Sequence, residues 1–523
     1  MEITDKKLPP LISTESSAVQ IILPGPNCTI SESATQIADL MASRDYFQRG
    51  SEIVRMATYS NGPVLKPISA QFLRAAAEKL GTLVRWGEAR GKSEPALQLA
   101  PCRMSADDAH ALLAAMSEFE LLPVIRAMVR FPSLKEDGTL QTGRYDAESR
   151  LFCTGPTQIP ELALEEAVEL LGHRGLLRDF RFQTESDASR LMAGILAPAL
   201  RFGPWRKSIE PFPLILTEAD KSQSGKGFAT EMIGTLYGEH VGNIPQQSKG
   251  GVGSFDEKIQ SELLSGRAFV CLDNLRGTLN CPVLESFMTA RGEFTLRAFF
   301  REGQTDSRAH LIFATSNGIQ MTEDLANRSL VVRLKKQPEG YPWYRWADGG
   351  VTGSLLGHLA VNRSRYLGAV YAVVRHWIRA GMPTNTTTHA FRDVVGALDW
   401  MVTESFGWPE LMDQHKAIQE RQSNPLLGFL RTFAQAVGAG QYSASELLEA
   451  AEEYGLQLPE AVLKRNDVDG PRQALGRLLG GIFNQREILQ VDQWSIERVQ
   501  VPRPDGGGGF LKAYRFKKIE SQN

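Results

Sequence analysis

The sequence predicts an α/β protein of about three domains. Its 523 residues exceed what one hydrophobic core usually serves, because domains commonly hold about 100–200 residues. Hydrophobic residues make up 42% and charged residues 23%, the balance of an ordinary folded protein rather than a disordered or fibrous chain. In the middle of the chain, short apolar runs that end in polar residues alternate with helical patterns. Such runs are typical of strands covered on both faces, as in a parallel sheet.

Residues 1–185 are expected to form an N-terminal α+β domain. Thr29–Glu32 and Ser105–Asp108 have the pattern of helix caps, and an apolar helical rhythm follows each. In this pattern the N-cap hydroxyl satisfies backbone N–H groups that the first helical turn leaves free. Strand-like runs on both sides of Asp137-Gly138 predict a hairpin-rich loop over residues 131–152.

Composition and the first residues exclude several classes of protein. The five cysteines are scattered singly, which argues against a zinc site or a disulfide framework and fits a reducing cytosol. No apolar stretch reaches the roughly 18–20 residues of a membrane span, and the N-terminus has no signal-peptide pattern, so we expect no membrane association. The net charge of −2 excludes a globally basic nucleic-acid coat, although not local basic patches.

The segment from Leu214 to Gly234 carries the clearest chemical signal. An apolar strand runs into a small polar loop, then into Gly225-Lys226 and a helix. In this context the helix N-terminus faces phosphate groups and a lysine reaches the β/γ oxygens. The residues expected to contact a nucleotide are Ser222, Gln223, Ser224, Gly225, Lys226, Gly227 and Phe228. The match to G-x-x-x-x-G-K-[ST] is imperfect, since Asp220 takes the first glycine position and Gly227 the hydroxyl position, and an ordinary strand–helix turn stays the alternative.

Two later strands raise the case for a nucleotide site. The run 268–273 ends in Asp273, the position of a carboxylate that organises Mg²⁺. The run 310–317 ends in Asn317, which places an amide near a γ-phosphate and its attacking water. Arg328 follows at the end of a short helix, before the next strand. Polar strand ends in this order are hard to explain by core packing, so we expect ATP and Mg²⁺ as ligands.

These residues resemble the motifs of AAA+ ATPases. Lys226 looks like the Walker A lysine and Asp273 like the Walker B aspartate. Asn317 looks like the sensor 1 residue and Arg328 like the arginine finger. The sequence of residues 272–334 resembles that of the MCM-like replicative helicases of phages and of mobile genetic elements such as staphylococcal cassettes. The likeness covers about 212–336 and, more loosely, 120–155. It implies an AAA+ P-loop domain with a helical lid over 186–410, Asp273 as the metal ligand, and a homo-hexamer in the bacterial cytoplasm.

Asn274 departs from the pattern of this family. It is a candidate catalytic residue because it stands where most AAA+ proteins have the glutamate that orients the attacking water. The base would then come from elsewhere, or turnover would be slow. Gly227 leaves Mg²⁺ to Asp273, water or Thr230.

The function that the resemblance implies is that of an ATP-dependent DNA helicase or translocase of a mobile genetic element, acting as a ring in replication initiation. The alternative is a nucleotide-switched DNA-binding initiator or regulator without unwinding activity, which Asn274 and Gly227 favour.

A hairpin is expected just before the strand that ends in Asn317, around residues 301–306. In the resembled helicases a hairpin at this location projects into the ring channel. The resemblance therefore implies that Arg301 faces DNA, with Arg297 and Arg308 as further candidates. An ordinary surface hairpin with solvated arginines is the alternative.

Residues 411–523 are expected to form a C-terminal winged-helix domain. Their pattern is helix, helix, helix, strand, turn, strand, the order in which the helix before the wing enters a major groove. Arg472 and Arg477 lie on that helix, and nine basic against four acidic residues between 472 and 518 give a local balance of +5. Winged helices also dock proteins, so protein docking stays the alternative to binding of duplex DNA by this domain. Single-stranded or forked DNA is the partner expected for the protein as a whole.

Overall fold

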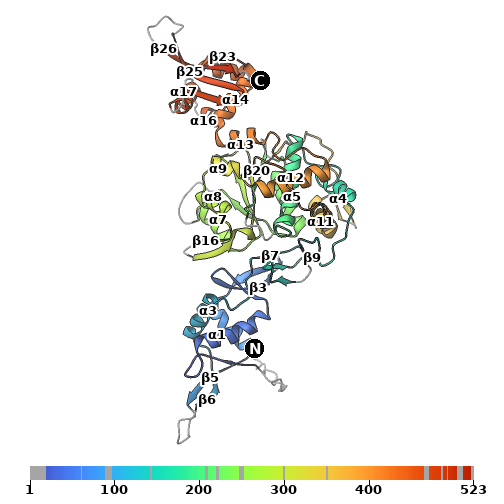
Figure 1. Cartoon of the computed structure of the whole chain (residues 1–523), viewed down its shortest axis with the longest axis vertical. Coiled ribbons are helices and arrows are strands. Elements are labelled where there is room, and N and C mark those ends of the chain that lie inside the picture. The colour runs from blue at the N-terminus through green and yellow to red at the C-terminus, as the bar shows by residue number, and fades with distance from the viewer. Residues whose placement is uncertain are drawn as a thin grey trace, which may run out of the picture.

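The chain folds as a mixed α/β protein with three bodies in succession along one axis, as a computed structural model shows (Figure 1). The N-terminal body is at one end of the molecule and the C-terminal body at the other. The described residues are 19–523 without 60–61, 89–96, 142–143, 206–209, 220–222, 247–252, 299–300, 349–350, 457, 464–469, 485–486, 492, 503–509 and 520–523.

The central body is built on a five-stranded parallel sheet. Its strands, in spatial order, are β13 (Gly242–Pro245), β14 (Phe269–Leu275), β18 (Leu311–Ser316), β12 (Leu214–Ala219) and β20 (Ser329–Leu334). The three strands predicted from apolar runs are confirmed as β12, β14 and β18, and β12 and β18 are buried along their whole length. Helices on both faces exclude water from these strands, which explains their continuous apolar sequence.

The order of the strands decides which chain ends meet. β18 lies between β12 and β14 although it follows both in sequence. Since all five strands are parallel, the carboxyl ends of β12, β18 and β14 are neighbours at one edge of the sheet. This carboxyl edge is where a strand order of this kind leaves a crevice for ligands.

Helices cover both faces of the sheet. On one face, α6 (Lys226–Tyr237) packs on the central strands and α5 (Glu185–Arg201) lies beside it, since a Cβ added at Gly194 of α5 would come within 3.2 Å of Ile215 on β12. On the other side of the sheet in Figure 1 lie α7 (Phe255–Leu264) and α8 (Pro282–Thr289).

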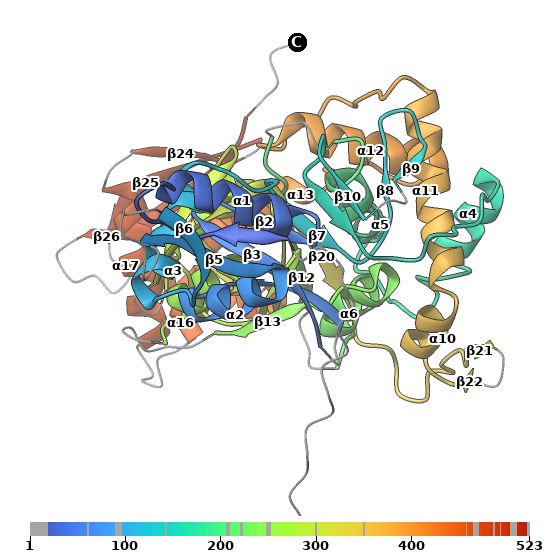
Figure 2. The ribbon, with the colours of Figure 1, turned by 90° about the horizontal axis from the view of Figure 1, so that it is seen from below.

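A layer of further helices extends the core beyond the sheet. It consists of α4 (Leu164–Leu171), α10 (Leu355–Val361), α11 (Arg363–Arg379) and α12 (Arg392–Phe406), of which α4, α11 and α12 gather on one side in Figure 2. One hydrophobic cluster runs from Ala127 to Ile418 and includes α4 and α5. The boundary expected at 185/186 therefore falls inside a continuous core. A contact between α4 and α11, two hundred residues apart, is invisible to local patterns.

The N-terminal body has a core of its own, from Ile21 to Leu122. Its helices are α1 (Ile30–Ala42), α2 (Ala70–Leu80) and α3 (Ala106–Glu118), and both predicted capping boxes are present, at Thr29 and Ser105. The two sheets have the orders β1-β5-β6 and β2-β3-β4, with strands Gln20–Ile22, Tyr46–Arg49, Glu52–Tyr59, Gly62–Pro67, Thr82–Glu88 and Leu97–Pro101 for β1 to β6.

The loop of residues 131–152 contains short paired strands, as its turn residues predict. The strands β8 (Ser133–Leu134) and β9 (Leu140–Gln141) are antiparallel around Gly138, whose φ of 79° is in the left-handed region that glycine adopts readily. β7 (Ala127–Val129), β10 (Tyr145–Asp146) and β11 (Leu151–Cys153) form a small sheet beside it.

The C-terminal body also has a hydrophobic core of its own, from Leu426 to Phe516. Its elements are α14 (Pro425–Val437), β23 (Gly440–Ser443), α15 (Ala444–Glu453), α16 (Glu460–Leu463), α17 (Gly470–Phe483), β24 (Ile488–Val491), β25 (Trp494–Pro502) and β26 (Phe510–Lys518). Three details differ from the expected order. The short helix α16 is added before α17, β23 adds a strand beside β26, and the run expected as one strand is two, β24 and β25, which pair with each other. Among the helices that the structure describes, none combines the length and apolarity of a membrane span.

Candidate functional site

The carboxyl edge of the central sheet begins with the loop after β12. Lys226 is the first residue of α6 and Gly225 is its N-cap, with a φ of 89°. Gln223 also has a positive φ, 64°. This left-handed backbone turns the loop tightly onto the start of α6, whose first N–H groups have no partner within the helix. A Cβ added at Gly227 would meet nothing within 4 Å, so the surface above the first turn is open. An open helix N-terminus of this kind favours an anion.

The structure brings four of the predicted catalytic residues together at this edge. The Lys226 Nζ donates a hydrogen bond to Asn317 Oδ1 at 2.7 Å. Asn317 Nδ2 lies 3.4 Å from Asn274 Oδ1. Thr315, buried at the end of β18, donates from Oγ1 to Asp273 Oδ1 at 2.7 Å and accepts from the Asn274 N–H at 2.8 Å. Thr315 was not predicted as a site residue, although the sequence Thr315-Ser316-Asn317 at a strand end is a signal for it.

The charged side chains at this edge are only partly buried. Partial burial lowers the pKa of Lys226, and Asp273 opposes that shift by stabilising the ammonium. Asn274 is exposed and has a φ of 54°, at the point where the pairing of β14 with β18 shifts register between Leu272 and Leu275, as at a β-bulge. Thr230 is buried and hydrogen-bonds the Cys271 thiol, which leaves Asp273 and water to meet a metal ion.

A cavity of about 430 Å³ opens beside the loop. Gln223, Ser224 and Gly225 form one wall. Five aromatic side chains line much of the rest, namely Phe180, Phe228, Trp343, Tyr344 and Trp346, together with Asp179, Arg181, Gln337 and Leu355. Of these aromatic residues, only Phe228 was among the predicted nucleotide contacts, although the aromatic cluster of residues 341–346 is plain in the sequence.

The aromatic walls of this cavity are held by specific contacts. Asp179 Oδ1 accepts hydrogen bonds from the Tyr341 hydroxyl at 3.2 Å and from the Tyr344 N–H at 3.4 Å. The guanidinium of Arg178 lies 4.2 Å from the centre of the Tyr344 ring. Phe180 and Phe228 approach with ring centres 6.3 Å apart. Flat apolar walls beside an anion site suit a ring that carries a phosphate chain.

Arg328 lies away from the other four residues. It is the C-cap of α9 (Glu323–Asn327) and precedes β20, whose first residue Ser329 is paired with Leu214 at the start of β12. The six residues of β12 separate it from the carboxyl edge, roughly 20 Å at about 3.3 Å per residue. Its side chain is 17% exposed, pairs with Asp324 at 2.7 Å and donates to the Glu285 carbonyl at 3.3 Å. Arg328 is thus on the opposite edge of the sheet from Lys226.

The predicted hairpin is present. β16 (Glu293–Ala298) and β17 (Arg301–Asp306) are antiparallel, and Arg297, which is exposed, lies opposite Glu302. The side chain of Arg301 and the whole of Ser222 are outside the described residues. Arg308 pairs with Asp306 at 2.6 Å, so its guanidinium is engaged within the hairpin.

The two candidate DNA-binding arginines of the C-terminal body are on one helix. Arg472 and Arg477 are exposed on α17, whereas Leu475 and Leu479 on the same helix are fully buried. The amphipathic pattern is therefore as predicted, with the basic side chains directed away from the core.

Comparison with known proteins gives distant structural likenesses. No family model matches the chain, and no curated protein matches it. A structure described as the apo C-terminal region of NrS-1 is 11% identical, with 92% of this chain and 99% of that chain covered and a TM-score of 0.34. A structure described as the SCCmec type IV Cch active helicase is 9% identical, with 90% and 91% covered and a TM-score of 0.30. The JCV helicase is 12% identical over 49% of this chain and 68% of that chain, with a TM-score of 0.19. TM-scores this low do not establish a shared fold.

Proposed function

We propose that this chain is an ATP-dependent DNA helicase or translocase with an AAA+ core that works as a ring, a homo-hexamer, in replication of a mobile genetic element. The observation that carries the proposal is the meeting of Lys226, Asp273, Asn274 and Asn317 at the carboxyl edge. A cation, a carboxylate and two amides above a helix N-terminus match the needs of a nucleoside triphosphate with its metal ion. An ordinary strand–helix turn would not need this set.

The residues of the edge have distinct tasks in this proposal. The N–H groups at the start of α6 bind the β- and γ-phosphates, and Lys226 turns from Asn317 to the γ-phosphate. The Asn317 amide, released from that bond, orients the attacking water. Asp273, which accepts a hydrogen bond from Thr315, would be the residue that holds Mg²⁺. Mg²⁺ neutralises phosphate charge when it is bound.

The aromatic cavity is the place for the base. Its volume of about 430 Å³ exceeds the need of a purine ring, and its mouth adjoins Gly225. Phe180 and Phe228 would contact the ring faces, and the phosphate chain would run from there over Gly225 to Lys226.

The position of Arg328 supports a ring. A side chain roughly 20 Å from the carboxyl edge does not reach a nucleotide of its own subunit. In a ring with head-to-tail contacts, two different surfaces of the subunit meet at every interface, so a residue far from its own site can lie beside the site of the next subunit. Arg328 would then complete the neighbour's site and couple hydrolysis to subunit contacts.

DNA would contact the hairpin of β16 and β17 through Arg297 and Arg301, and the helix α17 through Arg472 and Arg477. Arg297, Arg472 and Arg477 are exposed, and exposed arginines bind phosphates by charge, with an affinity that falls as salt rises.

A second candidate function is a nucleotide-switched initiator or regulator that binds DNA without unwinding it. The observation in its favour is Asn274, an amide at the strand end where a carboxylate would orient water, 3.4 Å from Asn317. Slow hydrolysis suits a switch better than a motor.

Strand displacement on a forked duplex tests the proposal. The parent protein with ATP and Mg²⁺ should unwind the fork and hydrolyse ATP, and Lys226→Ala should do neither. Hydrolysis and DNA binding without unwinding would favour the switch. ATP turnover equal in parent and Lys226→Ala would remove the nucleotide site altogether.

A further inference from the structure

Helix α13 (His415–Ser423) joins the central body to the C-terminal body and packs on α9, the element that carries Arg328. Gln419 of α13 donates from Nε2 to the carbonyl oxygen of Ala326 at 3.0 Å. Ala326 is the penultimate residue of α9, two positions before Arg328. One amide on α13 thus holds the last turn of the helix whose cap is Arg328.

This bond is important because α9 is very short. A helix of five residues forms few internal hydrogen bonds, so its terminal carbonyls depend on outside donors. Within its own segment, the Ala326 carbonyl shares the capping N–H of Arg328 with the Leu325 carbonyl. Thr322 anchors the other end, donating from Oγ1 to Glu285 Oε1 at 2.5 Å. Gln419 therefore fixes the end of α9 from which the Arg328 side chain leaves.

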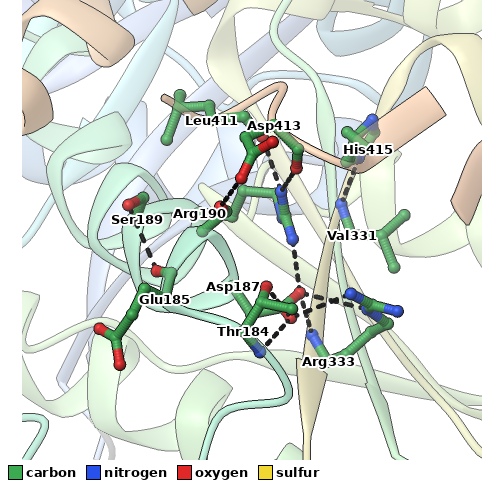
Figure 3. Close-up of polar contacts among 11 residues, drawn as sticks. Thr184, Glu185, Asp187, Ser189, Arg190, Val331, Arg333, Leu411, Asp413 and His415 are labelled. Carbon is green, nitrogen blue, oxygen red and sulfur yellow. Dashed lines mark hydrogen bonds and ion pairs between the residues drawn. The ribbon is translucent and has the colours of Figure 1, made fainter. Parts of the chain in front are cut away.

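The start of α13 is itself rigidly attached to the sheet. His415, fully buried, accepts at Nε2 the N–H of Val331 in β20 at 3.0 Å. Figure 3 shows this bond beside Arg190, which donates to the carbonyls of Leu411 at 2.7 Å and Asp413 at 3.2 Å. Ile418, 2% exposed, belongs to the central core. The helix is a fixed support for α9.

Helix α13 also contacts the C-terminal body. Glu420, the residue after Gln419, forms an ion pair with Arg431 of α14. The support for Arg328 and the contact with the C-terminal core are consecutive residues on one helix.

We infer that Gln419 is a positioning residue for the reaction in the neighbouring subunit. It holds the end of α9 so that Arg328 reaches the neighbour's nucleotide, and Glu420 ties the same helix to the C-terminal body. This inference rests on the proposed function, with Arg328 acting between subunits. Displacement of a catalytic cation by about 1 Å costs up to ~100-fold in rate, so one hydrogen bond at this point has a measurable effect.

The test uses subunits that can act only together. A Lys226→Ala subunit has no working site but offers an intact Arg328, and is the donor. An Arg328→Ala subunit has an intact Lys226 but offers no arginine, and is the acceptor. Mixed in equal amounts with free exchange, roughly a quarter of the interfaces pair an intact lysine with an intact arginine, and ATP hydrolysis returns there.

Gln419→Glu is then introduced into one subunit type at a time. The variant keeps the size of the side chain but replaces the donor amide with a carboxylate, which repels the Ala326 carbonyl. In the donor it should lower the recovered kcat about tenfold with KM unchanged. In the acceptor it should change kcat less than twofold. Gln414→Glu, the same charge change at an exposed position that begins the same helix, is the control and should have no effect in either subunit.

Each result decides the inference. Equal losses in donor and acceptor, or no loss in the donor, would overturn it, because a general structural defect does not distinguish the two subunits. Gln419→Ala, which removes the amide without adding charge, repeats the test if the Gln419→Glu protein does not fold. Absence of recovery in the unmodified mixture, with exchange shown by labelled subunits, would overturn the role of Arg328 in the proposed function and this inference with it. Recovery with no asymmetry would overturn this inference alone.

Discussion

Two polar clusters lie on the same central sheet and differ in their exposure to water and in the length of their contacts. The carboxyl-edge cluster (Lys226, Asp273, Asn274, Asn317) is partly exposed, and one of its contacts is as long as 3.4 Å. The second cluster, shown in Figure 3, surrounds Asp187 at the start of α5. The side chains of Asp187 and Arg190 there have no exposed surface, and they pair at 2.6 Å.

Both carboxylate oxygens of Asp187 accept hydrogen bonds. Oδ1 accepts from Arg190 Nη2 and from the Arg333 N–H at 2.9 Å, and Oδ2 accepts from the Thr184 hydroxyl at 2.7 Å and its N–H at 3.0 Å. Burial alone would raise the pKa of Asp187, but the charges of Arg190 and Arg333 outweigh it and hold that pKa below its usual value. Buried opposite charges that pair with each other fix structure, whereas polar groups paired loosely at an open edge are ready to exchange partners for a ligand.

The largest expected effect breaks the buried cluster. Asp187→Ala leaves Arg190 buried without its counter-charge and should lower the free energy of unfolding by about 3–5 kcal/mol. Chemical denaturation measures it. The control is Glu166→Ala, which removes an exposed partner of Arg365 and should cost below about 1 kcal/mol. Similar costs for the two variants would contradict the distinction between buried and exposed pairs.

As the pH falls, protonation of buried histidines should destabilise the folded protein before protonation of Asp187 does. Burial lowers the pKa of His389 to about 4. The folded protein therefore keeps this ring neutral, while the unfolded chain takes up a proton below about pH 6.5. Its stabilising effect is complete above pH 6.5 and declines as the pH falls toward 4, by about 2 kcal/mol at pH 5.

The measurement for this histidine is the free energy of unfolding against pH. His389→Gln should show a shallower decline between pH 6.5 and 5 than the parent. Asp187, whose folded pKa is depressed, contributes stability above its unfolded pKa near 3.9 and should add loss only below about pH 4. Identical slopes in parent and His389→Gln would contradict the assignment of a neutral ring.

Thr315→Val is the matched change at the carboxyl edge. It preserves shape but removes the hydroxyl that binds Asp273 and accepts from Asn274. The loss of about 1–2 kcal/mol of hydrogen bonding should lower ATP turnover about 5–30-fold and raise the Mg²⁺ concentration needed for half-maximal rate. A Mg²⁺ titration of the ATPase rate checks this. Unchanged Mg²⁺ dependence would show that Thr315 does not support a metal-binding Asp273.

The smallest expected effect concerns the C-terminal body. Arg472→Ala combined with Arg477→Ala should weaken duplex binding and reduce the slope of log affinity against log salt by about 2. Fluorescence anisotropy at several salt concentrations measures both. Affinity that stays the same at two salt concentrations would favour protein docking by α17.

The two clusters also show what the sequence reveals. Lys226, Asp273 and Asn317 were predicted because each follows an apolar run that local patterns identify as a strand. Asp187, Arg190 and Arg333 were not singled out, because charged residues in a sequence are expected at the surface and only the folded chain buries them together.

Long-range packing explains the other differences. The boundary expected at 185/186 lies within a shared core because α4 packs on α11. The aromatic cavity was missed because Phe180 and residues 341–346 meet the loop only in the fold. The distance of Arg328 from Lys226 follows from the pairing of β20 with β12, which no local pattern specifies.

Equilibrium binding of ATP with Mg²⁺ tests the central claim most directly, since it asks only whether the carboxyl edge is a nucleotide site. Titration calorimetry should detect binding by the parent. Lys226→Ala should bind at least tenfold more weakly, as a lost charge-assisted hydrogen bond of about 1.5–3 kcal/mol requires, with the same melting temperature in the absence of ligand. Equal affinity of parent and Lys226→Ala for ATP would contradict the account.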